Sequence, residues 1–141
     1  MQEFLSTENP PITQEWLGIW YTPMPDEVDP QDLEIVHARG LTAWKRFAIS
    51  KDKDPFEAAA QLIQEADGRK VYIFVPGRRF DRVGTRIGRG SGWMDRFLSK
   101  IPHHWLRIGV CGPKQWSNEL LKREAWDVPM DWVLHVFEHS K

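Results

Sequence analysis

Short apolar runs alternate with amphipathic stretches along most of the chain. Residues 70–75, KVYIFV, form a nearly continuous apolar run, which is typical of a strand buried on both faces of a parallel sheet. Shorter runs at 16–22, 41–49, 106–111 and 131–137 are predicted as further strands. The pattern therefore predicts a sheet whose most buried strand is the one at 70–75.

The strongest helix signal lies in residues 56–66, FEAAAQLIQEA, which are mostly good helix formers. Asp54 is a suitable cap because its carboxylate can accept hydrogen bonds from the first free amides. Pro55 suits the first helical turn, and Glu57 can reach back toward the cap. Gly68 is placed where a helix commonly ends.

Weaker helical stretches lie between other predicted strands. Residues 31–39 end before Gly40, and residues 93–101 end before a proline. Residues 115–125 are predicted to be partly helical. Because strands and helices alternate, the chain is predicted to form an α/β domain with a largely parallel sheet.

Length and composition limit the number of domains. The chain has 141 residues, of which 41% are hydrophobic, enough for one core and too few for two comfortable domains. Residues 1–15 are polar and contain Pro10-Pro11, so we expect an irregular amino-terminal arm followed by a single domain over residues 16–141. Cys111 is the single cysteine, which excludes an internal disulfide framework and fits a reducing compartment.

Charge and hydropathy argue against two classes of partner. The formal net charge is -1, so no general electrostatic attraction favours nucleic acid or an anionic membrane. No 18 apolar residues run together, and the first residues lack the basic and apolar parts of a secretory leader. We therefore expect a cytoplasmic protein with small-molecule ligands and no nucleic-acid or membrane partner. The sequence does not fix an oligomeric state.

Candidate chemistry is concentrated in GTRIGRGSGWMDRF, residues 84–97, which follow the predicted buried strand. A loop that leaves the carboxyl end of such a strand and enters a helix places backbone amides at a crevice of the sheet. Gly88, Gly90 and Gly92 would let these amides converge without a Cβ in the way. The stretch therefore predicts a phosphate-binding loop.

Charged side chains of the same stretch fit this interpretation. Arg86 and Arg89 can add charge-assisted contacts to a phosphate, and Asp95 can either cap the following helix or hold a divalent metal. The sequence has neither the Lys-Ser/Thr ending of a Walker A loop nor the order of a dinucleotide fingerprint. An ordinary strand-to-helix connection with solvated arginines stays open at this point.

Three ordered motifs resemble one family. FVPGRRFDRVGTRIGRGSGWMDRFL, RIGVCGPKQ and DVPMDWVL are similar to segments of the 5-formyltetrahydrofolate cyclo-ligases, also called methenyltetrahydrofolate synthetases. The resemblance covers roughly residues 70–134, and residues 17–30 resemble the early strand and the substrate-contacting glutamate segment of the family.

The resemblance implies both a fold and a reaction. The fold is a single three-layer α/β domain, cyclo-ligase-like (NagB/RpiA-like), with helices flanking a mostly parallel sheet. The reaction converts 5-formyltetrahydrofolate to 5,10-methenyltetrahydrofolate with ATP and Mg²⁺, and releases ADP and phosphate.

By position, the resemblance also implies site residues. The phosphate-binding loop corresponds to Gly88, Arg89, Gly90, Ser91 and Gly92. Asp95 falls at the metal-associated aspartate of the family, and Glu27 matches the glutamate near the formyl group. Glu27, Arg89 and Asp95 are therefore the predicted catalytic residues, and Arg86 and Trp93 are predicted to join the nucleotide site.

Two features depart from the family pattern. Trp93-Met94 replaces a pair of tyrosines, which keeps stacking area and removes the hydroxyl groups. No Lys or Arg precedes Arg39, whereas family enzymes carry an amino-terminal lysine and arginine that contact ATP. We therefore expect reduced turnover unless other cations take their place, the candidates being Lys45, Arg46, Arg78, Arg79 and Lys114.

Three functions stay open from the sequence. The first is an ATP-dependent cyclo-ligase, of full or impaired activity, acting on a reduced folate. The second is a catalytically inactive paralogue that binds a folate or a nucleotide in a regulatory role. The third is an α/β protein with an unrelated small phosphorylated ligand, because a fold and an anion loop do not fix a substrate.

Overall fold

A parallel sheet forms the centre of the computed structural model, which describes residues 9–50 and 52–136. Its strands are β1 (Leu17–Tyr21), β2 (Lys45–Phe47), β3 (Val71–Val75), β6 (Leu106–Cys111) and β7 (Trp132–His135). Their order is β2-β1-β3-β6-β7, and every neighbouring pair is parallel. β4 (Arg79–Phe80) and β5 (Arg86–Ile87) form a separate antiparallel hairpin.

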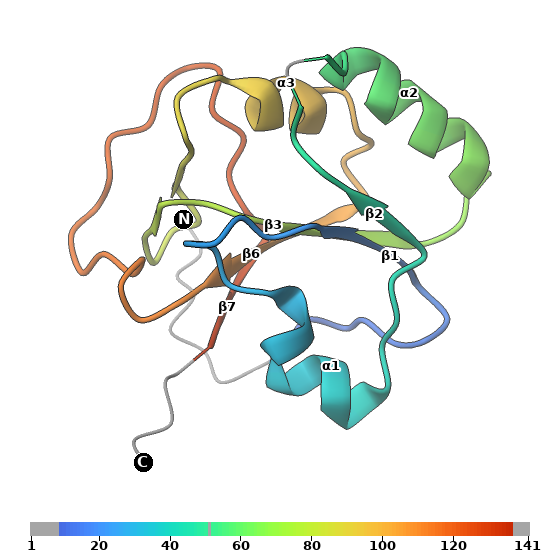
Figure 1. The fold of residues 1–141 in the computed structure, drawn as a ribbon, viewed down its shortest axis with the longest axis horizontal. Coiled ribbons are helices and arrows are strands. Elements are labelled where there is room, and N and C mark those ends of the chain that lie inside the picture. Colours follow the sequence, from blue (N-terminus) through green and yellow to red (C-terminus); the bar gives the residue numbers. More distant parts are fainter. Residues whose placement is uncertain (1–8, 51, 137–141) are drawn as a thin grey trace.

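Helices cover both faces of the sheet, so the domain has three layers (Figure 1). A short 3₁₀ helix (Pro30–Asp32) and α1 (Glu34–Arg39) lie on one face, and α2 (Pro55–Ala66) and α3 (Trp93–Ser99) lie on the other. β3 occupies the middle of the sheet, and all five of its residues are buried. The predicted α/β fold with a largely parallel sheet is confirmed.

Local signals explain the best-predicted helix, α2. The carboxylate of Asp54 accepts a hydrogen bond from the amide of Phe56 at 2.9 Å, and Pro55 occupies the first turn. The helix ends at Ala66, followed by Asp67 and Gly68 with φ of 49° and 76°. Both residues have the left-handed backbone conformation, which commonly terminates a helix and which glycine adopts without strain.

The β4–β5 hairpin packs against the sheet through Phe80, which is fully buried. A Cβ at Gly109 of β6 would lie 2.5 Å from the Phe80 ring, so a glycine is required there for this close approach. The amide of Phe80 donates to the carbonyl of Gln115 at 2.8 Å, and the amide of Ser117 donates back to Phe80 at 2.8 Å. The hairpin is thereby joined to the chain that follows β6.

Two sequence-based expectations differ from the structure. Residues 115–125 contain no helix, and two of their amides bond to distant groups: Ser117 donates to the carbonyl of Phe80 and Leu121 to the carboxylate of Asp81, each at 2.8 Å. The predicted amino-terminal arm is irregular where it is described, at residues 9–15, yet Ile12 is fully buried. Arg39 fixes this part by donating to the carbonyls of Pro10 and Ile12 at 2.6 and 2.7 Å. The arm therefore contributes to the core, which the sequence did not predict.

Candidate active site

A cleft of about 430 Å³ opens at the carboxyl ends of β1 and β3, which are neighbours in the sheet. The chain leaves β1 toward α1 on one face and leaves β3 toward α3 on the other (Figure 1). Adjacent parallel strands whose connections diverge in this way create a crevice in which α/β proteins commonly bind ligands. The residues that line the cleft are Glu27, Ile49, Pro76, Gly77, Arg86, Ile87, Gly88, Arg89, Gly90, Ser91, Gly92, Trp93, Met94, Asp95, Lys122, Glu124, Trp126 and Asp127.

The glycine loop, residues 88–92, forms one wall of this cleft. Gly90 and Gly92 have φ of 94° and 73°, and Gly92 directly precedes α3. A Cβ at Gly88 would lie 2.8 Å from Nη2 of Arg86, so the loop rests closely on that guanidinium group. Positive φ and this close approach explain why the segment needs glycines.

Arg86 and Asp95 lie together at the base of the cleft. Arg86 is 7% exposed, donates to the carbonyl of Pro76, and places Nη1 3.8 Å from Oδ1 of Asp95. Burial raises the pKa of Asp95, and the nearby Asp127 raises it further, whereas Arg86 opposes both effects. Burial lowers the pKa of Arg86, and the negative charge of Asp95 opposes this effect by raising it. The site therefore holds a cation and a carboxylate that is costly to ionise.

Glu27 and Arg89, two of the predicted catalytic residues, are in contact. Nε of Arg89 lies 3.5 Å from Oε2 of Glu27, and Nη2 forms an ion pair with Asp26. The hydrogen bond from Arg89 lowers the pKa of Asp26. Oε1 of Glu27 also accepts the amide of Met24 at 2.8 Å, and only 8% of the Glu27 side chain is exposed. Arg89 thus joins the glycine loop to the loop after β1.

Trp93 has much of its ring in the core. It is 5% exposed, its indole nitrogen donates to the carbonyl of Lys53 at 2.8 Å, and its ring stacks on Phe97 with centroids 5.3 Å apart. Phe47 stacks on it as well, at 6.2 Å. Trp93 lines the cleft, but these neighbours occupy much of its aromatic surface.

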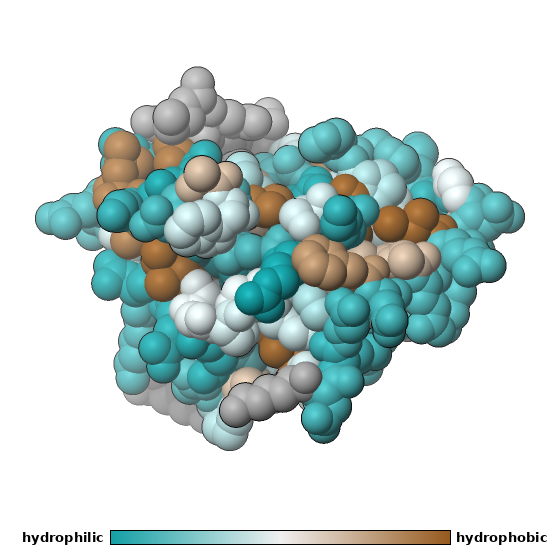
Figure 2. All heavy atoms as spheres, turned by 90° about the horizontal axis from the view of Figure 1, so that it is seen from above, coloured by the Kyte–Doolittle hydropathy of each residue, from teal (hydrophilic) through white to brown (hydrophobic). Residues whose placement is uncertain are grey.

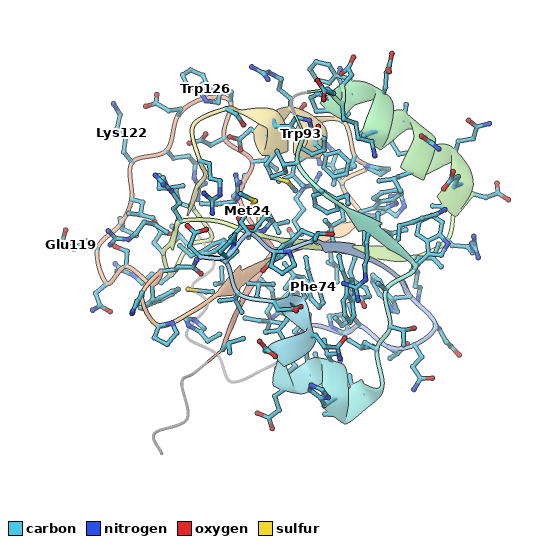
Figure 3. All side chains as sticks on the ribbon, viewed as in Figure 1. Met24, Phe74, Trp93, Glu119, Lys122 and Trp126 are labelled. Carbon is cyan, nitrogen blue, oxygen red and sulfur yellow. The ribbon has the colours of Figure 1, made fainter. Side chains whose placement is uncertain are left out.

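A further wall comes from the segment of residues 122–127, which sequence reasoning did not place in the site. Lys122, Glu124, Trp126 and Asp127 all line the cleft, and Figure 3 shows Lys122 and Trp126 on this segment. The amide of Glu124 donates to Oδ2 of Asp127 at 2.8 Å. Their only sequence signal was the DVPMDWVL motif, whose first residue is Asp127.

The cations proposed as substitutes for missing basic residues lie elsewhere. Lys45 pairs with Glu65 at 3.0 Å, and the guanidinium of Arg46 lies 5.2 Å from the ring centre of Trp20. Arg78, Arg79 and Lys114 are also absent from the described lining of the cleft. Besides Arg86 and Arg89, the cation that the cleft does include is Lys122.

The carboxylates of Asp95 and Asp127 suit a magnesium ion that also binds phosphate oxygens. In the described part of the chain, no three His, Cys, Asp or Glu residues are grouped as a metal site. Mg²⁺ typically keeps several waters and uses one or two carboxylates together with substrate phosphates. Two carboxylates beside a glycine loop therefore fit this ion.

The fold and the cleft define an α/β domain with a ligand crevice at the switch point of a parallel sheet. A family model, the 5-formyltetrahydrofolate cyclo-ligase family, matches residues 15–136, and the chain belongs to this family.

The relatives agree with this assignment. A 5-formyltetrahydrofolate cyclo-ligase of Mycoplasma genitalium is 31% identical over 62 residues, which are 44% of this chain and 36% of that protein. A 5-formyltetrahydrofolate cyclo-ligase of Mus musculus is 47% identical over 32 residues, or 23% of this chain and 16% of that protein. The matched stretches thus span about a third or less of these curated relatives.

One solved structure supports the fold. A 5,10-methenyltetrahydrofolate synthetase from Mycoplasma pneumoniae superposes with a TM-score of 0.51 and 19% identity, covering 83% of this chain and 71% of that one. Among the helices of the described residues, none has the length and apolar character needed to cross a bilayer.

Proposed function

We propose that this chain catalyses the ATP- and Mg²⁺-dependent conversion of 5-formyltetrahydrofolate to 5,10-methenyltetrahydrofolate. The observation that carries the proposal is the cleft itself. It joins Glu27, the glycine loop and Asp95, which come from segments distant in the sequence, in a chain of the cyclo-ligase family. The roles proposed for these residues are those that the family resemblance implies, and their shared place in one cleft supports the proposal.

The chemistry requires activation of a poor leaving group. An amide oxygen leaves poorly from carbon, so the formyl oxygen attacks the γ-phosphorus of ATP and ADP departs. The neighbouring folate nitrogen then attacks the formyl carbon and gives up its proton to the departing phosphate. The ring closes as the bond between carbon and the phosphate oxygen breaks, so that oxygen leaves as part of inorganic phosphate. The protein has to hold the formyl oxygen in line with phosphorus and to stabilise the charge that spreads over the phosphate.

The residues of the cleft divide this task. Amides of residues 88–92 face the phosphates, and the buried charge of Arg86 supports the loop from behind. Asp95 and Asp127 would hold the magnesium ion, which supplies positive charge to the phosphate oxygens. Glu27, fixed by Met24 and Arg89, orients the formyl-bearing end of the folate.

In this scheme Arg89 changes one of its partners when the nucleotide binds. In the free protein it pairs with Asp26 and Glu27. A triphosphate offers it more negative charge than Asp26 does, and the ion pair with Asp26 is exposed and therefore weak. Arg89 can exchange Asp26 for a phosphate oxygen at small cost. Arg89 would then contact the nucleotide directly and the folate only through Glu27.

The test is the appearance of methenyltetrahydrofolate and ADP when the purified chain is mixed with Mg-ATP and 5-formyltetrahydrofolate. We expect turnover that requires both substrates and that is lost in Glu27→Gln, while Leu120→Ala, an exposed change outside the cleft lining, keeps it. Calorimetric titration with each ligand alone accompanies the assay.

Binding of either ligand without turnover would contradict the proposal and favour the inactive binding paralogue. Binding of neither would leave an unrelated phosphorylated ligand as the better explanation. Comparison of the measured rate with that of a full-length family enzyme tests the expected reduction in activity.

A further inference from the structure

An unusually exposed indole lies at the cleft. Trp126 is 67% exposed, the highest value among the exposed large hydrophobic side chains of the described residues, whereas Trp93 is 5% exposed. Burying an aromatic ring of this size normally contributes strongly to stability, so a solvated indole gives up that contribution. Trp126 lines the same cleft as the glycine loop.

The backbone around Trp126 is fixed on both sides. The amide of Asp127 donates to the carbonyl of Glu124 at 3.1 Å, and the amide of Glu124 donates to the carboxylate of Asp127 at 2.8 Å. These reciprocal bonds close a tight turn that contains Trp126. Just before this turn, the side chain of Arg123 donates to Oγ1 of Thr85 at 2.8 Å and to the carbonyl of Val83 at 3.2 Å.

The ring of Trp126 takes no part in the aromatic packing of the described residues. The aromatic stacks and cation–π contacts found among the described residues involve other rings and leave the Trp126 indole free of such a partner. Figure 2 shows that the face seen from above is mainly hydrophilic, with small separate hydrophobic areas. A hydrogen-bonded turn therefore presents an unoccupied aromatic face beside a polar, charged cleft.

We infer that Trp126, rather than Trp93, stacks on the planar nitrogen heterocycle of a ligand bound in the cleft. The heterocycle is either the adenine of the nucleotide or the pterin of the reduced folate, both of which contain a planar, amino-substituted pyrimidine ring that can stack on an indole face. This inference rests on the proposed function, because that function supplies the heterocycle. Trp126 is then a ligand-contacting residue that contributes to substrate preference.

Ligands with and without a heterocycle separate stacking from other effects. Calorimetric affinities are measured for Mg-ATP, for inorganic tripolyphosphate with Mg²⁺, and for 5-formyltetrahydrofolate. The proteins are the wild type, Trp126→Ala, Trp126→Phe and the control Leu120→Ala. Leu120 is 55% exposed, belongs to the same chain segment, and lies outside the cleft lining, so it matches Trp126 in exposure and differs in position.

We expect Trp126→Ala to weaken one heterocyclic ligand about tenfold, and Trp126→Phe to recover most of that loss, as for other base-aromatic stacks. Binding of tripolyphosphate should be unchanged, and Leu120→Ala should match the wild type. A loss confined to Mg-ATP assigns the stack to adenine, and a loss confined to 5-formyltetrahydrofolate assigns it to the pterin.

Unchanged affinity of Trp126→Ala for both heterocyclic ligands, with normal wild-type binding, overturns the stacking inference and leaves the proposed function standing. An equal loss for tripolyphosphate overturns it too, because the residue would then act through the shape of the cleft. If the wild type binds neither heterocyclic ligand, both proposals fail. Far-UV circular dichroism of each variant confirms that folded proteins are compared.

Discussion

Asp26 controls the availability of Arg89 at the scale of single residues. Arg89 lines the cleft and forms an ion pair with Asp26, so Asp26 would compete with an incoming anion for the same guanidinium group. We expect Asp26→Asn to raise the affinity for tripolyphosphate about two- to threefold at low ionic strength, and we expect the gain to shrink as salt is added. Equilibrium binding at two salt concentrations measures it.

Glu119→Gln is the matched control for this change. Glu119 is an exposed acid on the segment after β6 (Figure 3), so its replacement alters the net charge by the same amount. An equal gain in both variants would mean that overall charge, rather than release of Arg89, produces the effect.

Asp95 is expected to affect ligand binding and stability in different ways. Burial raises its pKa above the ordinary value of 3.8, so the ionised form is less favourable in the folded protein than in the unfolded one. At neutral pH the carboxylate therefore lowers the free energy of unfolding. Asp95→Asn should leave this free energy within about 1 kcal/mol of wild type, unchanged or slightly higher, while weakening Mg-ATP about ten- to a hundredfold.

The pH dependence follows from the sign of that pKa shift. As the pH falls through the raised pKa, wild-type Asp95 takes up a proton and its unfavourable contribution disappears. Any stability advantage of Asp95→Asn should therefore be lost below pH 3.8, as measured by urea unfolding at several pH values. If Mg²⁺ has no influence on ATP affinity in either protein, Asp95 is not a metal ligand.

At the scale of elements, the glycine loop offers a test with an internal reference. Gly90 and Gly68 have φ of 94° and 76°, and a Cβ at either position would meet open space. Replacement of either glycine by alanine should lower the free energy of unfolding by about 1–2 kcal/mol, because the added side chain strains only the backbone conformation. Gly90→Ala should also weaken tripolyphosphate binding, whereas Gly68→Ala, at the end of α2, should not.

Unfolding in urea and binding of tripolyphosphate measure the two effects separately. Equal affinities for the two variants would show that the loop conformation does not matter for the anion. A loss of stability without a loss of affinity in Gly90→Ala would give the glycine a purely structural role.

The elements that could be predicted from the sequence are those with local causes. Asp54, Pro55 and the alanine-rich stretch after them define α2 through neighbours within a few residues, and the apolar run of β3 is sufficient to place it at the centre of the sheet. Residues 88–92 could be predicted as a loop at the edge of the sheet because they follow a buried strand and precede a helix, whereas Glu27 was predicted only through the family resemblance.

Long-range contacts explain what could not be predicted. Residues 115–125 have composition compatible with a helix, but Asp81 binds the amide of Leu121 from 40 positions away. The burial of Trp93 depends on Phe47 of β2, which no local pattern connects to it. For the same reason, the sequence could not show which tryptophan remains exposed at the cleft.

On the scale of the whole molecule, Asp81 joins the β4–β5 hairpin to the segment that leads into residues 122–127 of the cleft lining. It is fully buried, and its carboxylate accepts the amides of Val83, Thr85 and Leu121 at 3.0, 2.9 and 2.8 Å. Asp81→Ala leaves three donors without a partner, so the free energy of unfolding should fall by about 3 kcal/mol or more. Urea unfolding measures this, with the exposed Asp52→Ala as the control.

A loss below about 1 kcal/mol would mean that water replaces the carboxylate without difficulty. We expect the larger loss, because Thr85 is 2% exposed and its amide has little access to solvent.

Residues 112–131 contain no helix or strand and are held by scattered backbone and side-chain hydrogen bonds, which also determines where the protein is open to proteolysis. Segments held in this way open locally at a lower free energy than a sheet does. Lys122, with 85% of its side chain exposed, should be an early tryptic site in the free protein. A ligand that bridges the glycine loop and Trp126 would hold this segment closed, so the rate of cleavage after Lys122 would report occupancy of the cleft without any measurement of turnover.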